Sequence, residues 1–387
     1  MTKEELKKHK FISFVEDHYN PLNIIRSLGE EGIDPIVILI GEHPSMINHC
    51  KYVGKLHRVS TCEEGYKLLL SEYGKEDLKP FIFCSDDNST SFLDKHYEEL
   101  KDSFFFYNAG EQGRITWLQN KDNITNLGSE AGLCCPPKEI VDTGVLPKTL
   151  KYPIITKVLA STMGAWKGDV YICNNEKELS EAYKVIQSPK LCLQEYIHKK
   201  GEFCMEGFSI NDGRDIFMPF VADYIRFYDN SYGHYMVMKP FVDDELGDKI
   251  KNLLRRTKYN GIFEIEFMKG PQGEKYFLEI NFRASTWAYA LTVGGCNLPY
   301  FWAKSTLAGR ILYEEMNIRD TPFKAMVDYD DFKNNVLKGS LPLKQWIKEF
   351  KGCECHYQYN KEDPKPFRSY IRAEIWRMIK KFIFRIR

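Results

Sequence analysis

The feature of this sequence that most constrains its fold is a pair of alternating segments within residues 261–285. They flank Lys269-Gly-Pro-Gln-Gly273, and Gly and Pro in such a run are typical of a tight turn. Side chains alternate between the two faces of a β-strand, so every second residue shares a face. One face of the two segments is apolar and consists of Phe263, Ile265, Phe267, Leu278, Ile280 and Phe282. The pattern predicts a β-hairpin with one buried face.

The register of this hairpin follows from its apolar face. Pairing Phe267 with Leu278 brings all the apolar side chains to one side, whereas a slip of one residue would mix the two faces. The same register sets Glu266 opposite Glu279 on the other face. We therefore expect two carboxylates to face each other across neighbouring strands.

Facing carboxylates repel each other unless a cation lies between them. Glu264 lies opposite Asn281 in the same register, so an amide oxygen accompanies Glu266 and Glu279. Two carboxylates and an amide oxygen are hard ligands that suit Mg²⁺ or Mn²⁺. The alternative is a solvated sheet face that carries acids, with Arg283 continuing the polar row.

These four polar residues resemble the metal-binding hairpin of the ATP-grasp superfamily. Members carry an acidic or amide ligand on one strand and E-x-N-x-R on the next, which Glu266, Glu279, Asn281 and Arg283 match position by position. The resemblance implies that Glu266, Glu279 and Asn281 bind the metal. It implies that Arg283 is catalytic and stabilises the transferring phosphoryl group or a tetrahedral oxyanion, the alternative being a structural pair with Glu279.

Three lysines resemble phosphate contacts of the same superfamily. Lys121, at the start of a predicted helix, is similar to the lysine that meets the nucleotide, and Lys157 ends a strand as the lysine beside the ATP phosphates does. Residues 161–170 stand where members have a loop over the phosphates, with Lys167 as a further contact. This loop has fewer glycines than the Gly-rich form of the family, a departure that bears on how well ATP binds.

The adenosine end of ATP is assigned by the same resemblance. Leu193–Ile197 is similar to the hinge strand of the family, where Glu195 and the backbone around Tyr196 and Ile197 hold adenine. Glu202 follows as the candidate for the ribose hydroxyls. These matched segments occur in the same order as in the family, from residue 120 to residue 283, so they support one another.

The first third of the chain shows a different pattern, of short apolar runs and helical segments. Residues 11–17, 35–40 and 79–85 resemble buried strands of a parallel sheet, and 20–32 and 63–74 have helical spacing and then a glycine. The segment predicts βαβ units. No G-x-G-x-x-G follows the first strand, which argues against dinucleotide binding.

We expect an α/β chain with the ATP-grasp fold, preceded by a Rossmann-like pre-ATP-grasp domain. In its second segment, residues 115–132 have a helical pattern and residues 152–158 a strand pattern. The expected divisions are the N-terminal domain, the small ATP-grasp lobe, the catalytic lobe with the hairpin, and a helical basic tail, at residues 1–112, 113–190, 191–310 and 311–387.

Composition excludes some classes of protein. Lys+Arg and Asp+Glu balance at 54 each, so no overall field favours nucleic acid. The first residues lack the apolar core of a secretion signal, and no run approaches the ~18 apolar residues of a membrane span. The chain has 11 cysteines without a disulfide framework, which predicts reduced thiols in the cytoplasm. Cys353-x-Cys355-His356 has no second pair at zinc-ligand spacing.

The resemblance implies an ATP-dependent carboxylate–amine ligase that works through an acyl phosphate and releases ADP. Within the superfamily the chain looks most like D-aspartate ligases, from its first strand to about residue 305. Cell-wall or surface-polysaccharide synthesis, with a small or lipid-linked acid and amine, is the role that this likeness implies. Two rivals remain: a nucleotide-binding module without turnover, and an ATP-grasp enzyme that phosphorylates something other than a carboxylate.

The C-terminal segment, residues 365–387, is the most basic part of the chain. It carries eight cations and a single acid, Glu374, and its apolar residues recur at three- and four-residue steps. Such a helix either packs on its own domain or lies on an anionic membrane. The second alternative places the protein peripherally on the inner face of the membrane.

Overall fold

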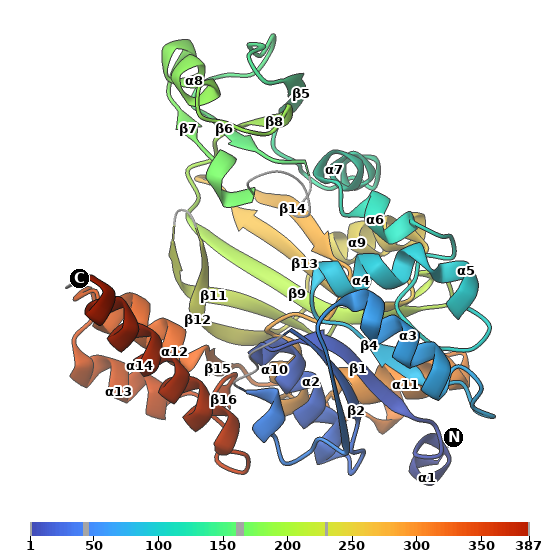
Figure 1. The fold of residues 1–387 in the computed structure, drawn as a ribbon. Coiled ribbons are helices and arrows are strands. Elements are labelled where there is room, and N and C mark those ends of the chain that lie inside the picture. Colours follow the sequence, from blue (N-terminus) through green and yellow to red (C-terminus); the bar gives the residue numbers. More distant parts are fainter. Residues whose placement is uncertain (1, 42–45, 160–165, 229–230, 386–387) are drawn as a thin grey trace.

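The computed structural model of the protein describes residues 2–41, 46–159, 166–228 and 231–385 (Figure 1). A four-stranded parallel sheet in the order β3-β2-β1-β4 forms its first part. Its strands are β1 (Phe11–Glu16), β2 (Ile36–Ile40), β3 (Lys55–Val59) and β4 (Phe81–Phe83). The three expected strands are present. β3 was not predicted, because only Leu56 and Val59 of its sequence KLHRV are apolar and it lies at the edge of the sheet.

Helices surround this sheet. They are α1 (Lys3–Leu6), α2 (Tyr19–Glu30), α3 (Cys62–Tyr73), α4 (Asp87–Lys95) and α5 (Tyr97–Leu100), with the short 3₁₀ helix η1 (Ile47–His49). Gly65 lets α3 pack tightly on the sheet, since a Cβ atom there would lie 2.9 Å from the Phe14 side chain. Buried apolar residues of both strands and helices make the core.

A small antiparallel sheet forms a separate upper lobe (Figure 1). Its order is β5-β8-β6-β7, with strands β5 (Lys138–Asp142), β6 (Ile154–Lys157), β7 (Ile172–Cys173) and β8 (Lys190–Glu195). The 3₁₀ helix η2 (Trp166–Asp169) and helix α8 (Glu176–Tyr183) complete it. The phosphate-loop residues 160–165 lie outside the described residues.

The helical segment expected at 115–132 is two helices, α6 (Arg114–Leu118) and α7 (Lys121–Glu130). The break falls at Asn120, because its side chain accepts the backbone N–H of Asp122 at 2.9 Å and so caps α7. The cap fixes where α7 begins, and Lys121 is its first residue.

The third sheet is the largest and has eight strands. Seven follow the order β14-β13-β9-β11-β12-β15-β16, and β10 pairs with β9. The strands are β9 (Gly201–Ile210), β10 (Asp215–Phe217), β11 (Phe220–Tyr228), β12 (Ser231–Pro240), β13 (Gly261–Lys269), β14 (Lys275–Asn281), β15 (Phe323–Met326) and β16 (Cys355–His356). Helices α9 (Asp244–Thr257), α10 (Ala288–Val293) and α11 (Leu298–Ala308), with the 3₁₀ helix η3 (Tyr313–Glu315), accompany it.

The parallel sheet and the large sheet share one hydrophobic core. Trp302 of α11 joins them, because its ring lies 5.6 Å from that of Phe81, 5.3 Å from that of Phe83 and 5.0 Å from that of Tyr107. The two sheets are therefore packed together as one body.

The hairpin register is confirmed where the polar residues meet, and is wrong by one residue beyond them. Glu266 pairs with Glu279, but Phe267 pairs with Phe277 because a β-bulge leaves Leu278 unpaired. Phe277 is fully buried and lies against Gly128 of α7, where a Cβ atom would be 2.7 Å from its ring. Filling this space turns Leu278 away from the core and into the pocket described below.

The C-terminal part is a helical lobe beside the large sheet (Figure 1). It comprises α12 (Asp328–Asp331), the π-helix η4 (Phe332–Val336), α13 (Leu343–Lys351) and α14 (Lys365–Arg385). Arg26 of α2 and Asp363 form a fully buried ion pair at 3.2 Å that ties this lobe to the N-terminal sheet. Among the described residues, no helix has the length and apolar composition to cross a membrane.

Candidate active site

A pocket of about 440 Å³ lies between the upper lobe and the hairpin β13–β14. This size is ordinary for a small-molecule site, where volumes run from ~300 to ~1,000 Å³. The predicted site residues that line it are Lys121, Lys157, Glu195, Tyr196, Ile197, Glu202, Glu266, Glu279, Asn281 and Arg283. Lys167 lies in η2, and its side chain is outside the described part of the chain.

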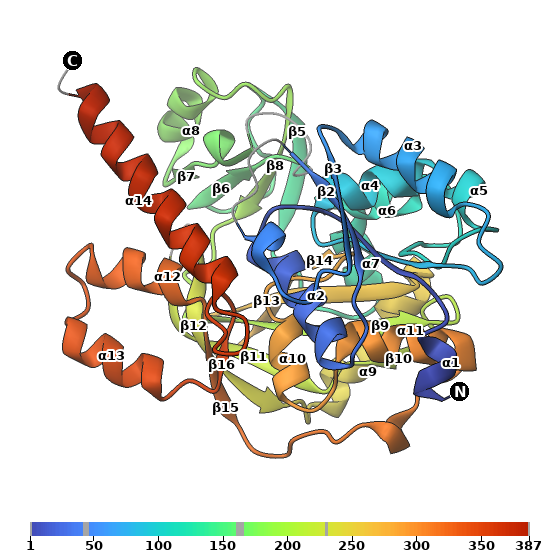
Figure 2. The same cartoon turned by 60° about the horizontal axis from the view of Figure 1, so that its bottom comes forward.

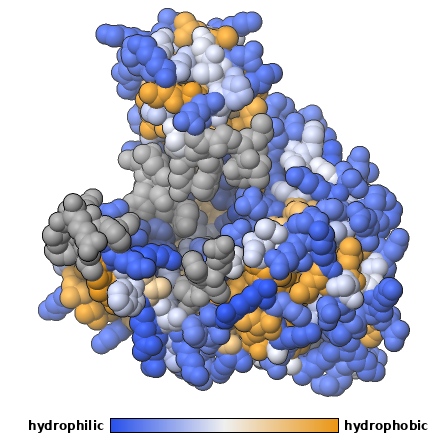
Figure 3. All heavy atoms as spheres, viewed as in Figure 1, coloured by the Kyte–Doolittle hydropathy of each residue, from blue (hydrophilic) through white to orange (hydrophobic). Residues whose placement is uncertain are grey.

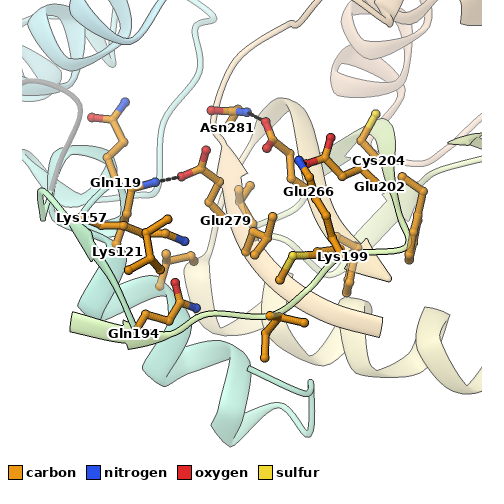
Figure 4. A pocket seen from close by; sticks show the side chains of 18 of the residues that line it. Gln119, Lys121, Lys157, Gln194, Lys199, Glu202, Cys204, Glu266, Glu279 and Asn281 are labelled. Carbon is orange, nitrogen blue, oxygen red and sulfur yellow. Dashed lines mark hydrogen bonds and ion pairs between the residues drawn. The ribbon is translucent and has the colours of Figure 1, made fainter. Parts of the chain in front are cut away.

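The polar face of the hairpin forms one wall of the pocket (Figure 4). Asn281 donates its Nδ2 hydrogens to Glu264 at 2.8 Å and to Glu266 at 2.9 Å. Its Oδ1 accepts a hydrogen bond from Arg283 at 3.2 Å. Glu264 and Glu266 therefore fix which way the amide of Asn281 points.

The carboxylates of this wall differ in their surroundings. Burial and the neighbouring Glu279 and Glu264 raise the pKa of Glu266 well above its ordinary value. The ammonium of Lys121 lowers the pKa of Glu279, with which it forms an ion pair. A positive charge at this wall stabilises the ionised carboxylates, and Lys121 supplies part of it in the ligand-free protein.

The donor set fits a hard divalent cation. Glu266, Glu279 and the amide oxygen of Asn281 offer oxygens only, and they leave coordination positions for phosphate oxygens and water. No group of three or more His, Cys, Asp and Glu side chains in the described part of the chain is arranged to hold a metal by itself.

Lys157, at the end of β6, faces the same pocket (Figure 4). No hydrogen bond or ion pair joins its ammonium to any described residue. Burial and the nearby Lys121 lower the pKa of Lys157 to about 8. The ammonium is therefore charged at neutral pH without a counter-ion, which makes it a fitting contact for a phosphate.

This pKa predicts how nucleotide binding depends on pH. The free Lys157 loses its proton as the pH rises through about 8, so ATP affinity should fall by up to about tenfold per pH unit above that value. We expect Lys157→Arg to keep its affinity between about pH 7 and about pH 9, because arginine stays charged. Titration calorimetry of both proteins checks this, and a flat wild-type profile would show that Lys157 does not meet the phosphates.

The hinge residues lie where β8 ends and β9 begins. The backbone N–H of Tyr196 donates to Pro153 at 2.8 Å, and the Glu195 carboxylate accepts the N–H of Lys151 at 3.0 Å. Both groups thus hold the hinge strand against the upper lobe. Glu202 is paired with Lys199 at 2.6 Å, so a ribose would meet a carboxylate that is already oriented.

Arg283 also lines the pocket. Its Nε donates to Asp87 at 2.8 Å, whereas Glu279 is held by Lys121. Although burial opposes the charged form, Asp87 and Glu264 raise the pKa of Arg283. The guanidinium stays charged at any physiological pH.

Three residues in or beside the pocket were not predicted to act there. Glu264 orients Asn281, Lys199 pairs with Glu202, and Asp87 holds Arg283. Asp87 had a usable signal, because it comes four residues after the end of β4 and begins α4, and ligands of parallel sheets bind where strands end at the carboxyl edge. Glu264 also had one, since it shares a hairpin face with Glu266.

No family model matches this chain. A curated N5-carboxyaminoimidazole ribonucleotide synthase of Staphylococcus aureus (strain COL) is 25% identical over 171 residues, which cover 42% of this chain and 43% of that protein. This chain thus matches less than half the length of its curated relatives.

Solved structures match over much more of the chain. N5-carboxyaminoimidazole synthetase from Staphylococcus aureus has a TM-score of 0.65 at 15% identity and covers 85% of each chain. L-amino acid ligase from Bacillus licheniformis has a TM-score of 0.61 at 14% identity, covering 82% of this chain and 79% of that one. Biotin carboxylase from Campylobacter jejuni, solved with an ATP analogue, has a TM-score of 0.62 at 16% identity and covers 81% and 74%.

These likenesses show that the chain has the ATP-grasp fold, as its hairpin predicted. By name, the proteins that it resembles include a synthetase and an L-amino acid ligase. The resemblance to D-aspartate ligases remains a likeness of sequence segments.

Proposed function

We propose that this protein is an ATP-dependent ligase that joins a carboxylate to an amine and releases ADP. The observation that carries the proposal is one pocket in which two carboxylates and an amide on the hairpin face the ammonium of Lys157 on the upper lobe, an ammonium without a partner among the described residues. The shared fold and the names of two structural relatives support it. So does the presence of the hinge residues Glu195, Tyr196 and Ile197 in the lining of the same pocket.

The chain's own residues divide the work of binding. The hinge at Glu195–Ile197 holds the adenine, Glu202 the ribose, and Lys157 the phosphates, with Lys167 as a further contact. Glu266, Glu279 and Asn281 would hold Mg²⁺, or Mn²⁺, which neutralises phosphate charge when bound. When the metal binds Glu279, the ammonium of Lys121 either leaves this carboxylate or contacts it together with the metal. In both cases Lys121 would also contact the nucleotide.

Activation solves a chemical difficulty, because a carboxylate is a poor electrophile. A carboxylate oxygen attacks the γ-phosphorus of ATP, the bond to the β–γ bridging oxygen breaks, and ADP leaves. The amine then attacks the carbonyl carbon of the acyl phosphate and inorganic phosphate leaves, with loss of a proton from nitrogen. Arg283 is positioned by Asp87 to stabilise charge on the transferring phosphoryl group or the oxyanion.

Pooled acids and amines test the proposal. ADP is expected only when ATP, an active acid and an active amine are all present. ADP formation with an alcohol or other non-carboxylate acceptor would instead make the protein a kinase of this fold. Tight ATP binding without ADP formation in any pool would make it a binding module.

The identity of the substrates is a finer part of this proposal. The reacting groups of a small acid and a small amine fit the size of the pocket. We favour a substrate pair in which the acid or the amine is linked to a lipid. The basic segment 365–387 supports this choice, because it suits contact with the inner face of a membrane from the cytoplasm. Cell-wall and surface-polysaccharide precursors are substrates of this kind.

A further inference from the structure

Helix α14 is packed along its first half and free along its second. Tyr370 packs on the core, and the Glu374 side chain is buried and paired with Arg377. From residue 375 to residue 380 every side chain is exposed. Figure 2 shows the second half of the helix leaving the rest of the molecule.

The exposed second half of α14 carries large hydrophobic side chains, which a helix of a globular protein usually buries. Its exposed large side chains are Ile375, Trp376, Met378 and Ile379, of which Trp376 is 62% and Met378 50% accessible. At 100° per residue, Ile375 and Ile379 lie on the face opposite Tyr370. The helix therefore docks on its own lobe through Tyr370 and Glu374 and turns its aliphatic face outward.

Charge adds a second feature to this helix. Residues 365–387 carry eight cations, and their single acid, Glu374, is buried and neutralised by Arg377 and Lys333. The exposed side chains around the apolar residues thus include Arg372 and Lys380 and no acid within the described residues. The net charge of the whole chain is zero, so residues 365–387 are a local concentration of positive charge.

Helix α13 of the same lobe and the turn before it repeat this combination. Leu343 and Ile347, one helical turn apart, are exposed, and Lys344 and Lys348 lie beside them. Leu337, after η4, is 57% exposed. Figure 3 shows hydrophobic surface on this lobe.

We propose that the helical lobe, α13 with α14, is a docking surface for an anionic lipid membrane. Trp376, Met378 and Ile379 enter the headgroup region while the surrounding cations meet lipid phosphates. A membrane is favoured over a protein partner because cations accompany the exposed apolar side chains and residues 365–380 expose no acid, as binding to anionic lipid phosphates requires. The helix lies on the membrane rather than crossing it, since it lacks an apolar span.

This docking deepens the proposed work on a lipid-linked substrate and rests on it for its purpose. The full chain without ATP is sedimented with vesicles of equal parts phosphatidylglycerol and phosphatidylcholine, and with vesicles of phosphatidylcholine alone. Pelleting is expected with the anionic vesicles only, and to decrease as salt rises. Vesicle sedimentation involves no turnover. Absence of vesicle binding would therefore not contradict the proposed ligase activity, and absence of ligase activity would not contradict vesicle binding.

Paired variants separate the two contributions. Trp376→Gln with Ile379→Gln removes apolar contact, and Arg372→Gln with Lys380→Gln removes charge; each pair is expected to weaken vesicle binding about tenfold or more. The control is Lys249→Gln with Lys251→Gln on α9, the same charge change away from the lobe, which should bind as wild type. The inference is overturned if the wild-type protein stays in the supernatant at low salt, or if the tail and α9 variants bind alike. In either case another protein would be the occupant to seek.

Discussion

Glu279→Gln should abolish turnover while leaving the protein folded. The substitution keeps the shape of the side chain but removes the charge that faces Glu266 across the hairpin. A metal ligand and the partner of Lys121 are lost together, and several kcal/mol of electrostatic stabilisation correspond to a loss of about a thousandfold in kcat. Initial rates of ADP formation measure the effect, and circular dichroism checks the fold.

The matched control for this variant is Glu274→Gln. Glu274 belongs to the turn of the same hairpin, where its carboxylate accepts the N–H of Gln272 at 2.9 Å, and it does not line the pocket. Activity close to wild type is expected. If Glu279→Gln retained its rate at low Mg²⁺ concentration, or if both variants lost activity equally, the metal assignment would be wrong.

The second large effect concerns stability. Arg26→Met should lower the free energy of unfolding by about 3–5 kcal/mol, because it leaves the buried carboxylate of Asp363 without its cation. Arg26 is 0% and Asp363 1% exposed, and the guanidinium also donates to the backbone oxygens of Gln358 and Asp363. Urea unfolding measures the loss.

Two further proteins make this stability test specific. Lys55→Ala breaks the exposed Lys55–Glu72 pair, whose atoms lie 3.8 Å apart, and should cost under about 1 kcal/mol. Arg26→Met with Asp363→Leu replaces the buried pair by apolar groups and should recover part of the lost stability. Equal effects of Arg26→Met and Lys55→Ala would show that the pair does not hold the C-terminal lobe.

The hairpin shows how far local sequence carries a structural prediction. Period-two alternation fixed the faces of β13 and β14, so the Glu266–Glu279 pair was predictable. The bulge at Leu278 was not, because it depends on the space that Gly128 leaves for Phe277. Gly128 is far away in sequence and belongs to α7.

Ion pairs between distant segments were equally hidden. Lys121 was expected to meet a nucleotide, but its partner Glu279 is 158 residues away, and Arg283 finds Asp87 at a separation of 196. Such pairs depend on how the three sheets assemble, which periodicity does not encode. In α14 the sequence left packing and membrane contact open, and the exposure of Ile375 and Trp376 favours the second.

Hydroxylamine trapping tests most directly whether the protein activates a carboxylate as an acyl phosphate. In the incubation that forms ADP, hydroxylamine replaces the amine and attacks the acyl phosphate, so that an activated acid is collected as its hydroxamate. With the acyl-phosphate route, we expect hydroxamate and ADP in equal amounts with wild-type protein, and neither product with Glu279→Gln. AMP and pyrophosphate as the products, with the same hydroxamate, would show that the acid is adenylated and would contradict the account.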